Sequence, residues 1–276
     1  AINGDIFGWG AIYVPTTSYE AYCSANVWSD YKDRIVTTEI ADLCIEASST
    51  EGKSGVLNAI GLEGADKVVK LKVIGSINSY DIIVFRDKMP MLCELDLSEA
   101  TVIASSKPFY GNTYCTGNNS LGSYAFYDLD KLVNVKLPKN LHTLGDYTFQ
   151  YCDGLITVDA TATAELNIGN YAFNGCRSLE KIIFPEYVST IGTSAFANCT
   201  RLATVIIGDN VTIGENAFYN DQYHAESYKV VRKVYDTTSK KQIEKEFAVY
   251  YVVLDGSITT LTIGDNVTLE RGAFYG

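Results

Sequence analysis

The chain contains few of the residues on which metal binding and acid–base catalysis most often depend. Only two of its 276 residues are histidines, His142 and His224, which leaves little imidazole chemistry near neutral pH. Cations are also outnumbered. There are 22 Lys and Arg against 33 Asp and Glu, and the net charge of −11 repels phosphate backbones and anionic lipid headgroups. We therefore expect no nucleic-acid partner, and the sequence predicts no metal and no cofactor.

Membrane-spanning segments and catalytic motifs are missing as well. No apolar run approaches the roughly 20 residues that a bilayer-spanning helix needs, so no membrane insertion is expected. The motifs G-x-S-x-G, H-E-x-x-H, G-x-x-x-x-G-K-[S/T] and G-x-G-x-x-G do not occur. Carboxylate pairs such as Asp128/Asp130 and Glu244/Glu246 could in principle serve a glycosidase, but such pairs on turns and hairpins usually face solvent. We predict no catalytic residues and interpret the chain as a protein that is not an enzyme.

The residues that are present describe a folded, β-rich protein. Apolar residues make up 47% and charged residues 20%, which is close to the average of globular proteins. Twenty tyrosines stand beside only five prolines and two methionines. Seven cysteines cannot all pair with one another, and their spacing does not form the C-x-x-C pairs of zinc or redox sites.

A five-residue motif, G-x-x-[A/T]-F, recurs along the chain at a nearly constant interval. Five copies end at Phe126, Phe149, Phe173, Phe196 and Phe218, and a degenerate sixth copy ends at Phe274. Successive copies are 22 to 24 residues apart, except that the last gap of 56 residues contains an insertion. Three copies place a cysteine three residues after the phenylalanine, at Cys152, Cys176 and Cys199. The period indicates a repeat architecture.

Two short apolar segments accompany each copy of the motif. The run Leu179-x-x-Ile182-x-Phe184 alternates with the period of a strand, and the pair Val188/Ile191 leads into the next glycine. A unit of this size cannot bury its apolar side alone, so neighbouring units must stack. The sequence therefore predicts a parallel-β solenoid with coils of about 22–24 residues.

Inside this solenoid, the repeated phenylalanines and cysteines are expected to point inward and form ladders along the axis. The ladder cysteines are interpreted as inert core thiols. The glycine of the motif is interpreted as a residue that takes a positive φ where the chain turns. The sequence predicts no pairing for the remaining cysteines, Cys23, Cys44, Cys93 and Cys115.

The consensus Leu-x-x-[Val/Ile]-x-[Leu/Phe]-Pro…Ile-Gly-x-x-Ala-Phe-x-x-Cys-x-x-Leu, seen clearly over 179–202, resembles the BspA-like branch of leucine-rich-repeat proteins found on bacterial surfaces. The resemblance runs from Leu92 to Phe274 and implies a leucine-rich-repeat solenoid with a helix-containing N-terminal cap. One helix is expected over Asn78–Met89, with Asn78 or Ser79 as N-cap. Its buried side is expected to consist of Ile82, Ile83 and Phe85. A further helix is expected around Lys53–Leu62.

We divide the chain into three parts. Residues 1–36 resemble the C-terminal cap of a preceding repeat module, 37–98 form the N-terminal cap, and 99–276 form the solenoid with insertions at 103–120 and 220–255. The last residues, 274–276, stand in mid-repeat. We therefore expect either a segment of a longer tandem protein or end-to-end self-association through the last coil.

The two insertions supply candidate binding residues. The first carries Phe109, Tyr110 and Tyr114 among small polar residues, a composition that suits contact with carbohydrate or protein. Alternatively, this loop folds back over the first coil as part of the cap. The second insertion is predicted to form a hairpin from strands over Tyr228–Tyr235 and Ile243–Leu254. Its candidate binding residues are Tyr228, Lys229, Arg232, Lys233 and Tyr235, although the lysines also suit an edge that resists aggregation.

The strand face that is not packed inward should present two columns of side chains. The first column comprises Glu94, Asn134, Thr157, Lys181, Thr204 and Thr260, and the second comprises Asp96, Lys136, Asp159, Ile183, Ile206 and Thr262. From these columns we select as candidate binding residues Glu94, Asp96, Asn134, Lys136, Asp159 and Lys181. The alternative is a solvated face without a ligand.

The resemblance implies an extracellular or cell-surface module that binds protein or carbohydrate, with adhesion to a host matrix or to other cells as its expected role. A structural spacer within a larger surface protein is the first alternative. A glycan-active enzyme with an unusual site is the second.

Overall fold

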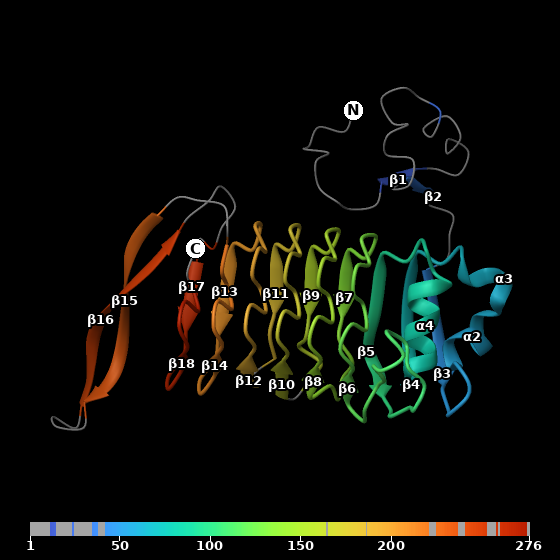
Figure 1. Ribbon diagram of the computed structural model, residues 1–276, viewed down its shortest axis with the longest axis horizontal. Coiled ribbons are helices and arrows are strands. Elements are labelled where there is room, and N and C mark those ends of the chain that lie inside the picture. Colours follow the sequence, from blue (N-terminus) through green and yellow to red (C-terminus); the bar gives the residue numbers. More distant parts are fainter. Residues whose placement is uncertain are drawn as a thin grey trace.

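A computed structural model of the chain describes residues 12–14, 24, 35–37, 42–163, 165–185, 187–220, 225–236, 241–252, 258 and 260–274 (Figure 1). The predicted cap-like segment 1–36 lies outside these residues, apart from Ser24 and two short strands that pair in parallel, β1 (Ile12–Val14) and β2 (Ile35–Thr37). None of the helices in the described part is both long enough and apolar enough to cross a bilayer.

The N-terminal region interleaves helices with the first strands of a sheet. In chain order it contains β3 (Asp42–Ser48), α2 (Gly55–Ile60), α3 (Leu62–Ala65), β4 (Lys70–Ile77), α4 (Ser79–Asp87) and β5 (Glu94–Val102). Helix α4 begins after Asn78, whose side chain accepts a hydrogen bond from the Tyr80 backbone N–H. Ile82 and Phe85 are buried as expected, but Val84 is buried where Ile83 was predicted, and Ile83 is half-buried.

The buried carboxylate of Asp81 joins these elements. It accepts hydrogen bonds from the Ser54 hydroxyl at 2.6 Å, from the Val56 backbone N–H at 3.0 Å and from the Asn78 backbone N–H at 2.8 Å. The Ser49 hydroxyl at the end of β3 also donates to it. A buried carboxylate is tolerated when its oxygens are hydrogen-bonded in this way, so Asp81 fixes the starts of α2 and α4 against β3.

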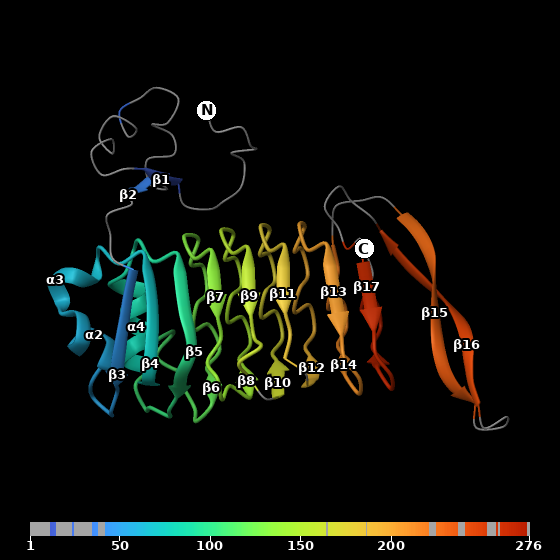
Figure 2. The ribbon, with the colours of Figure 1, turned by 180° about the vertical axis from the view of Figure 1, so that it is seen from behind.

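Parallel strands continue from this region into a solenoid of two sheets, one on each side of the core (Figures 1 and 2). The eight-stranded sheet has the order β17-β13-β11-β9-β7-β5-β4-β3 and the six-stranded sheet the order β18-β14-β12-β10-β8-β6. The larger sheet adds β7 (Asn134–Lys136), β9 (Thr157–Asp159), β11 (Lys181–Ile183), β13 (Thr204–Ile207) and β17 (Thr260–Ile263). The smaller sheet contains β6 (Ser120–Leu121), β8 (Thr143–Leu144), β10 (Glu165–Ile168), β12 (Tyr187–Ile191), β14 (Thr212–Ile213) and β18 (Thr268–Leu269). The predicted leucine-rich-repeat solenoid is confirmed.

The second insertion leaves the stack of coils uninterrupted. Its residues form an antiparallel hairpin of β15 (Ala225–Asp236) and β16 (Lys241–Val252), paired over all twelve positions. Strand β13, before the insertion, pairs directly with β17, after it, so that Thr204 lies opposite Thr260. The hairpin therefore leaves the solenoid at one coil boundary and adds no coil of its own.

Stacked side chains fill the interior of the coils. The rings of the six motif phenylalanines form one continuous column, with centroids 4.9–5.2 Å apart and planes within 11° of parallel, consisting of Phe126, Phe149, Phe173, Phe196, Phe218 and Phe274. The thiols of Cys152 and Cys176 each donate a hydrogen bond to a phenylalanine carbonyl of the preceding coil at 2.9 Å. Cys199 does so at 3.1 Å. Burial raises the pKa of these thiols well above its ordinary value, which keeps them protonated.

The motif glycines have a different role from the predicted one. None of Gly145, Gly169 or Gly192 has a positive φ. Instead, a Cβ built on any of them would lie 2.5–2.6 Å from atoms of the preceding coil. The glycine is therefore required by the close approach of two coils, and the prediction of a left-handed glycine was wrong.

The left-handed conformation falls two residues later in the motif. Tyr124, Tyr147 and Tyr171 have φ of 65°, 58° and 56°, followed by Ser194 at 51° and Asn216 at 54°. Such residues are rarely left-handed outside tight turns. Hydrogen bonds between coils offset the strain, since each of the three tyrosine N–H groups donates to a carbonyl of the next coil at 2.9–3.0 Å.

Candidate binding site on the strand face

The outer face of the eight-stranded sheet brings the two predicted columns into register. The first column continues through Lys70, Glu94, Asn134, Thr157 and Lys181, which are direct partners on successive strands. The second column runs through Cys44, Lys72, Asp96, Lys136 and Asp159. The sequence pattern had identified neither Lys70 nor Lys72 as a column member, because β3 and β4 lie outside the regular period.

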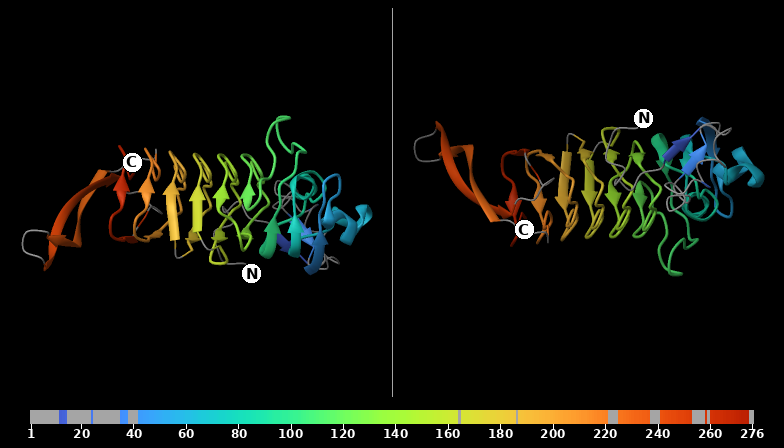
Figure 3. Two further views of the ribbon diagram at one scale, coloured as in Figure 1. Left: turned by 90° about the horizontal axis from the view of Figure 1, so that it is seen from below. Right: turned by 90° about the horizontal axis from the view of Figure 1, so that it is seen from above.

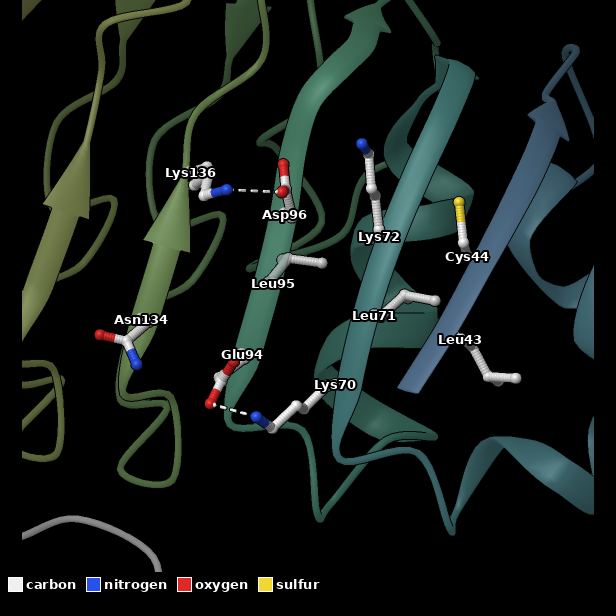
Figure 4. Close-up of a pocket in the computed structure, with 10 residues that line it drawn as sticks. All are labelled: Leu43, Cys44, Lys70, Leu71, Lys72, Glu94, Leu95, Asp96, Asn134 and Lys136. Carbon is white, nitrogen blue, oxygen red and sulfur yellow. Dashed lines mark hydrogen bonds and ion pairs between the residues drawn. The ribbon is translucent and has the colours of Figure 1, made fainter. Parts of the chain in front are cut away.

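A hollow of about 340 Å³ lies on this face across β3, β4, β5 and β7 (Figure 4). Of the predicted candidates, Glu94, Asp96, Asn134 and Lys136 line it, whereas Asp159 and Lys181 belong to the same columns outside its lining. Figure 4 shows charged side chains along both sides, with Leu43, Leu71 and Leu95 between them. The Leu71 and Leu95 side chains are 2% and 1% exposed and belong to the core, so the accessible side chains of the hollow are mainly those of its charged rim.

Ion pairs hold this rim in place. The Lys70 ammonium lies 2.9 Å from Glu94, and the Lys136 ammonium lies 2.9 Å from Asp96 (Figure 4). Lys72 pairs with Glu99, further along β5. Because these side chains are 22–53% exposed, the pairs add little stability and remain accessible to a partner.

Asp96 is the most tightly held carboxylate of the hollow. Partial burial raises its pKa, but hydrogen bonds from Ser98 and Lys136 outweigh that effect and bring the pKa below its ordinary value. The Ser98 hydroxyl donates to Asp96 at 2.6 Å, and the Ser98 N–H donates to the same oxygen at 3.0 Å. Asp96 therefore stays negatively charged at neutral pH and acts as a fixed hydrogen-bond acceptor.

The second column changes character along the solenoid. Its first half alternates in sign through Lys72, Asp96, Lys136 and Asp159, whereas the next two positions, Ile183 and Ile206, are apolar and precede Thr262. Ile206 is 61% exposed on the surface of β13. One face of the solenoid therefore carries both charged side chains and an exposed aliphatic one.

The first insertion lies beside the helical cap. Figure 3 shows the loop at 103–120 on one side of the solenoid. It is tied to the cap, because the Ser79 hydroxyl lies 3.2 Å from that of Thr116 and Ser106 donates to Glu51. The candidate residues Phe109, Tyr110 and Tyr114 are all half-buried.

Tyr110 and Tyr114 belong to a larger cluster that the sequence reasoning missed. Seven tyrosine rings gather on the coil turns with centroids 4.6–6.4 Å from their neighbours, namely Tyr110, Tyr114, Tyr124, Tyr127, Tyr147, Tyr151 and Tyr171. Burial, followed by neighbouring phenols, raises the pKa of Tyr124 and Tyr147, so their hydroxyls are neutral. The signal was present in the sequence, since tyrosine stands two residues before the motif phenylalanine in three successive repeats.

The remaining candidates belong to the hairpin. Tyr228, Lys229, Arg232, Lys233 and Tyr235 all lie on β15, opposite positions 242–249 of β16. Strand alternation assigns Lys229, Lys233 and Tyr235 to one face and Tyr228 and Arg232 to the other. The register therefore divides these five residues between two faces.

A second hollow, of about 490 Å³, lies beside the six-stranded sheet. It is lined by His142, Glu165, Tyr187 and Ser189, among others. His142 is exposed, and the Ser189 hydroxyl donates to Glu165. In the part of the chain that the structure describes, no three His, Cys, Asp or Glu side chains are arranged to hold a metal ion.

Comparison with known families identifies the type of repeat. Residues 107–224 match the family described as BspA type leucine rich repeat region, in six copies. A search of curated proteins finds no match to the chain. The matched range includes the motif copies from Phe126 to Phe218, whose rings stack in the core.

Proposed function

For this chain, a protein of the BspA-type leucine-rich-repeat family, we propose the function of a non-enzymatic, extracellular protein-binding module that serves in adhesion. The observation that carries this proposal is the outer face of the eight-stranded sheet. There a hollow with a charged rim lies on the same face as the exposed Ile206 side chain of β13. We expect the partner to be a protein, because alternating fixed charges select a partner by electrostatic complementarity while the exposed Ile206 side chain supplies apolar area that a partner can bury.

The strand face has the chemistry of recognition rather than of a reaction. Its carboxylates Glu94 and Asp96 are each paired with a lysine. Asp96 has a lowered pKa, the opposite of what a general acid needs at neutral pH. The hollow is near the lower limit of small-molecule sites, which span roughly 300–1,000 Å³. A side chain of a partner protein fits such a hollow.

The test measures binding of the whole chain to a panel of purified extracellular-matrix proteins and to a glycan array. We expect saturable binding to at least one protein. Lys72→Ala combined with Lys136→Ala should weaken it at least tenfold, and Ile206→Thr should weaken it about fivefold. Thr262 occupies the next position of the same column, so threonine suits this face. The control is Lys88→Ala combined with Lys139→Ala, which removes two exposed lysines outside the hollow.

Binding to glycans alone, or equal losses in the two double variants, would overturn the proposal. If no probe binds at micromolar concentration, the spacer alternative replaces it. Deletion of residues 220–255 separates binding by the hairpin from binding by the strand face. The direct pairing of β13 with β17 means that this deletion spares the coil contact. End-to-end self-association stays a prediction of the sequence.

A further inference from the structure

The tyrosine cluster contains an ordered stack, which we call the tyrosine column: Tyr110, Tyr124, Tyr147 and Tyr171. Neighbouring centroids in this column are 4.6, 4.7 and 5.1 Å apart, and the ring planes are within 12° of parallel. Stacking covers the faces between the rings. A ligand that uses an aromatic face can therefore bind only at an end of the column.

The first end already holds a cation from the same chain. The guanidinium of Arg86 lies over the Tyr110 ring, 5.2 Å from its centroid. Its Nη1 also donates to the Tyr124 carbonyl at 2.8 Å, which fixes its position. A guanidinium over an electron-rich ring is a favourable cation–π arrangement. The column therefore shows one arginine site that is filled from within the protein.

The other end lacks a ring. Ser194 occupies the next coil position with the same left-handed backbone as Tyr171, since their φ values are 51° and 56°. Its N–H donates to the Glu215 carbonyl at 2.9 Å, just as the Tyr171 N–H donates to the Thr193 carbonyl at 2.9 Å. The backbone repeat continues, but serine supplies no ring at the fourth coil position. Within the described residues, the only ring stacked on Tyr171 is that of Tyr147.

The charges on these turns favour a cation at this end. Arg177 is paired with Asp153 and Arg271 with Glu215, so these arginines are already neutralised. The Asp146 carboxylate, which accepts a hydrogen bond from the Asn170 backbone N–H at 2.7 Å, lies beside Tyr171 and forms no ion pair with any described residue. The whole chain has a net charge of −11. An uncharged aromatic ring would also stack on Tyr171, but it would gain nothing from the Asp146 carboxylate.

We propose that the Tyr171 end of the tyrosine column, beside Ser194, binds the guanidinium of an arginine in an extended basic segment of a partner protein. The guanidinium stacks one coil height beyond Tyr171 and mirrors Arg86 at the opposite end. This site lies on the coil turns and uses none of the residues that line the hollow of the strand face. A test of this site therefore does not depend on the outcome of the test of the proposed function.

Three fluorescein-labelled glycine-rich nonapeptides test the site by fluorescence anisotropy. Each peptide has blocked ends and contains three copies of one residue, which is arginine, lysine or citrulline. Arginine and citrulline share a planar group, whereas arginine and lysine share a positive charge, so the comparison separates the effect of shape from that of charge. We expect the arginine peptide to bind more tightly than the lysine peptide, and the citrulline peptide to bind weakest. Tyr171→Leu should weaken arginine binding about fivefold, the size of an exposed cation–π contact. Tyr171→Phe, which keeps the ring, should stay within twofold of the wild type.

A second variant keeps the test valid if Tyr171→Leu disturbs the fold. Ser194→Leu retains the Tyr171 ring but fills the space beside it, and should weaken arginine binding to a similar extent. The control is Tyr187→Leu, which removes a tyrosine that is 60% exposed but is no member of the tyrosine cluster. Unchanged arginine binding by both Tyr171→Leu and Ser194→Leu would overturn the proposal. Equal binding of the citrulline peptide, or equal competition by a neutral oligosaccharide, would also overturn it, because the site would then recognise a flat or apolar surface rather than a cation.

Discussion

The close approach of coils at the motif glycines makes Gly192→Ala the most informative perturbation of the fold. A Cβ at this position would lie 2.6 Å from the Asn170 nitrogen and 2.6 Å from the Gly169 carbonyl carbon. Ordinary carbon contacts are about 3.5–4.0 Å, so the coils would have to separate locally by roughly 1 Å. Both opposing atoms belong to the backbone and cannot rotate away. The separation would also lengthen the hydrogen bond from the Gly192 N–H to the Ile168 carbonyl, now 2.9 Å.

Overpacking of a well-packed interior costs about 1–3 kcal/mol. We expect Gly192→Ala to lower the free energy of unfolding by about 3 kcal/mol, because the added methyl group would clash with the backbone of the neighbouring coil. For a chain of this size the melting temperature should then fall by about 6–12 °C in differential scanning calorimetry. Gly111→Ala is the matched control. Gly111 has a φ of 56°, and an added Cβ would approach no atom more closely than 4.0 Å, so the substitution should cost only the strain of a left-handed alanine, about 1 kcal/mol. Equal shifts in the two variants would refute the close-approach explanation.

Two further substitutions test the core and the acidic turn. Cys176→Ser should lower the free energy of unfolding in urea by roughly 1–3 kcal/mol, because the shorter C–O bond leaves a buried hydroxyl in a poorer hydrogen bond to the Phe149 carbonyl. An unchanged free energy would contradict the role of the cysteine ladder. The pKa of Asp130 is raised by burial and then by the charges of Asp128 and Asp153. Its folded pKa thus exceeds the unfolded value of about 3.9, and stability is lost as pH rises between the two. Asp130→Asn should therefore raise the melting temperature at pH 7 and leave it unchanged near pH 3, whereas an equal shift at both values would exclude the electrostatic cause.

The sequence alone determined the repeat architecture, because that architecture is a periodic property. A phenylalanine every 22–24 residues can form one column only if each period makes one coil, and the rings do stack at 4.9–5.2 Å. The strand columns follow from the same period. Aligned repeats place Asn134, Thr157 and Lys181 side by side in successive strands. The sequence also indicated the hairpin, because the period is broken by an insertion that contains two β-prone runs.

The tertiary structure decided what lies outside the period or between coils. The hollow requires β3 and β4, whose residues Cys44, Lys70 and Lys72 precede the regular repeats. They enter the columns only because β3 pairs in parallel with β4 and β4 pairs in parallel with β5. The tyrosine column joins Tyr110, from an irregular loop, to three repeat positions, and its ring stacking is a contact between coils. The role of the glycine was misassigned for the same reason. A sequence shows where a small residue recurs, whereas only the distance to the neighbouring coil shows whether conformation or space requires it.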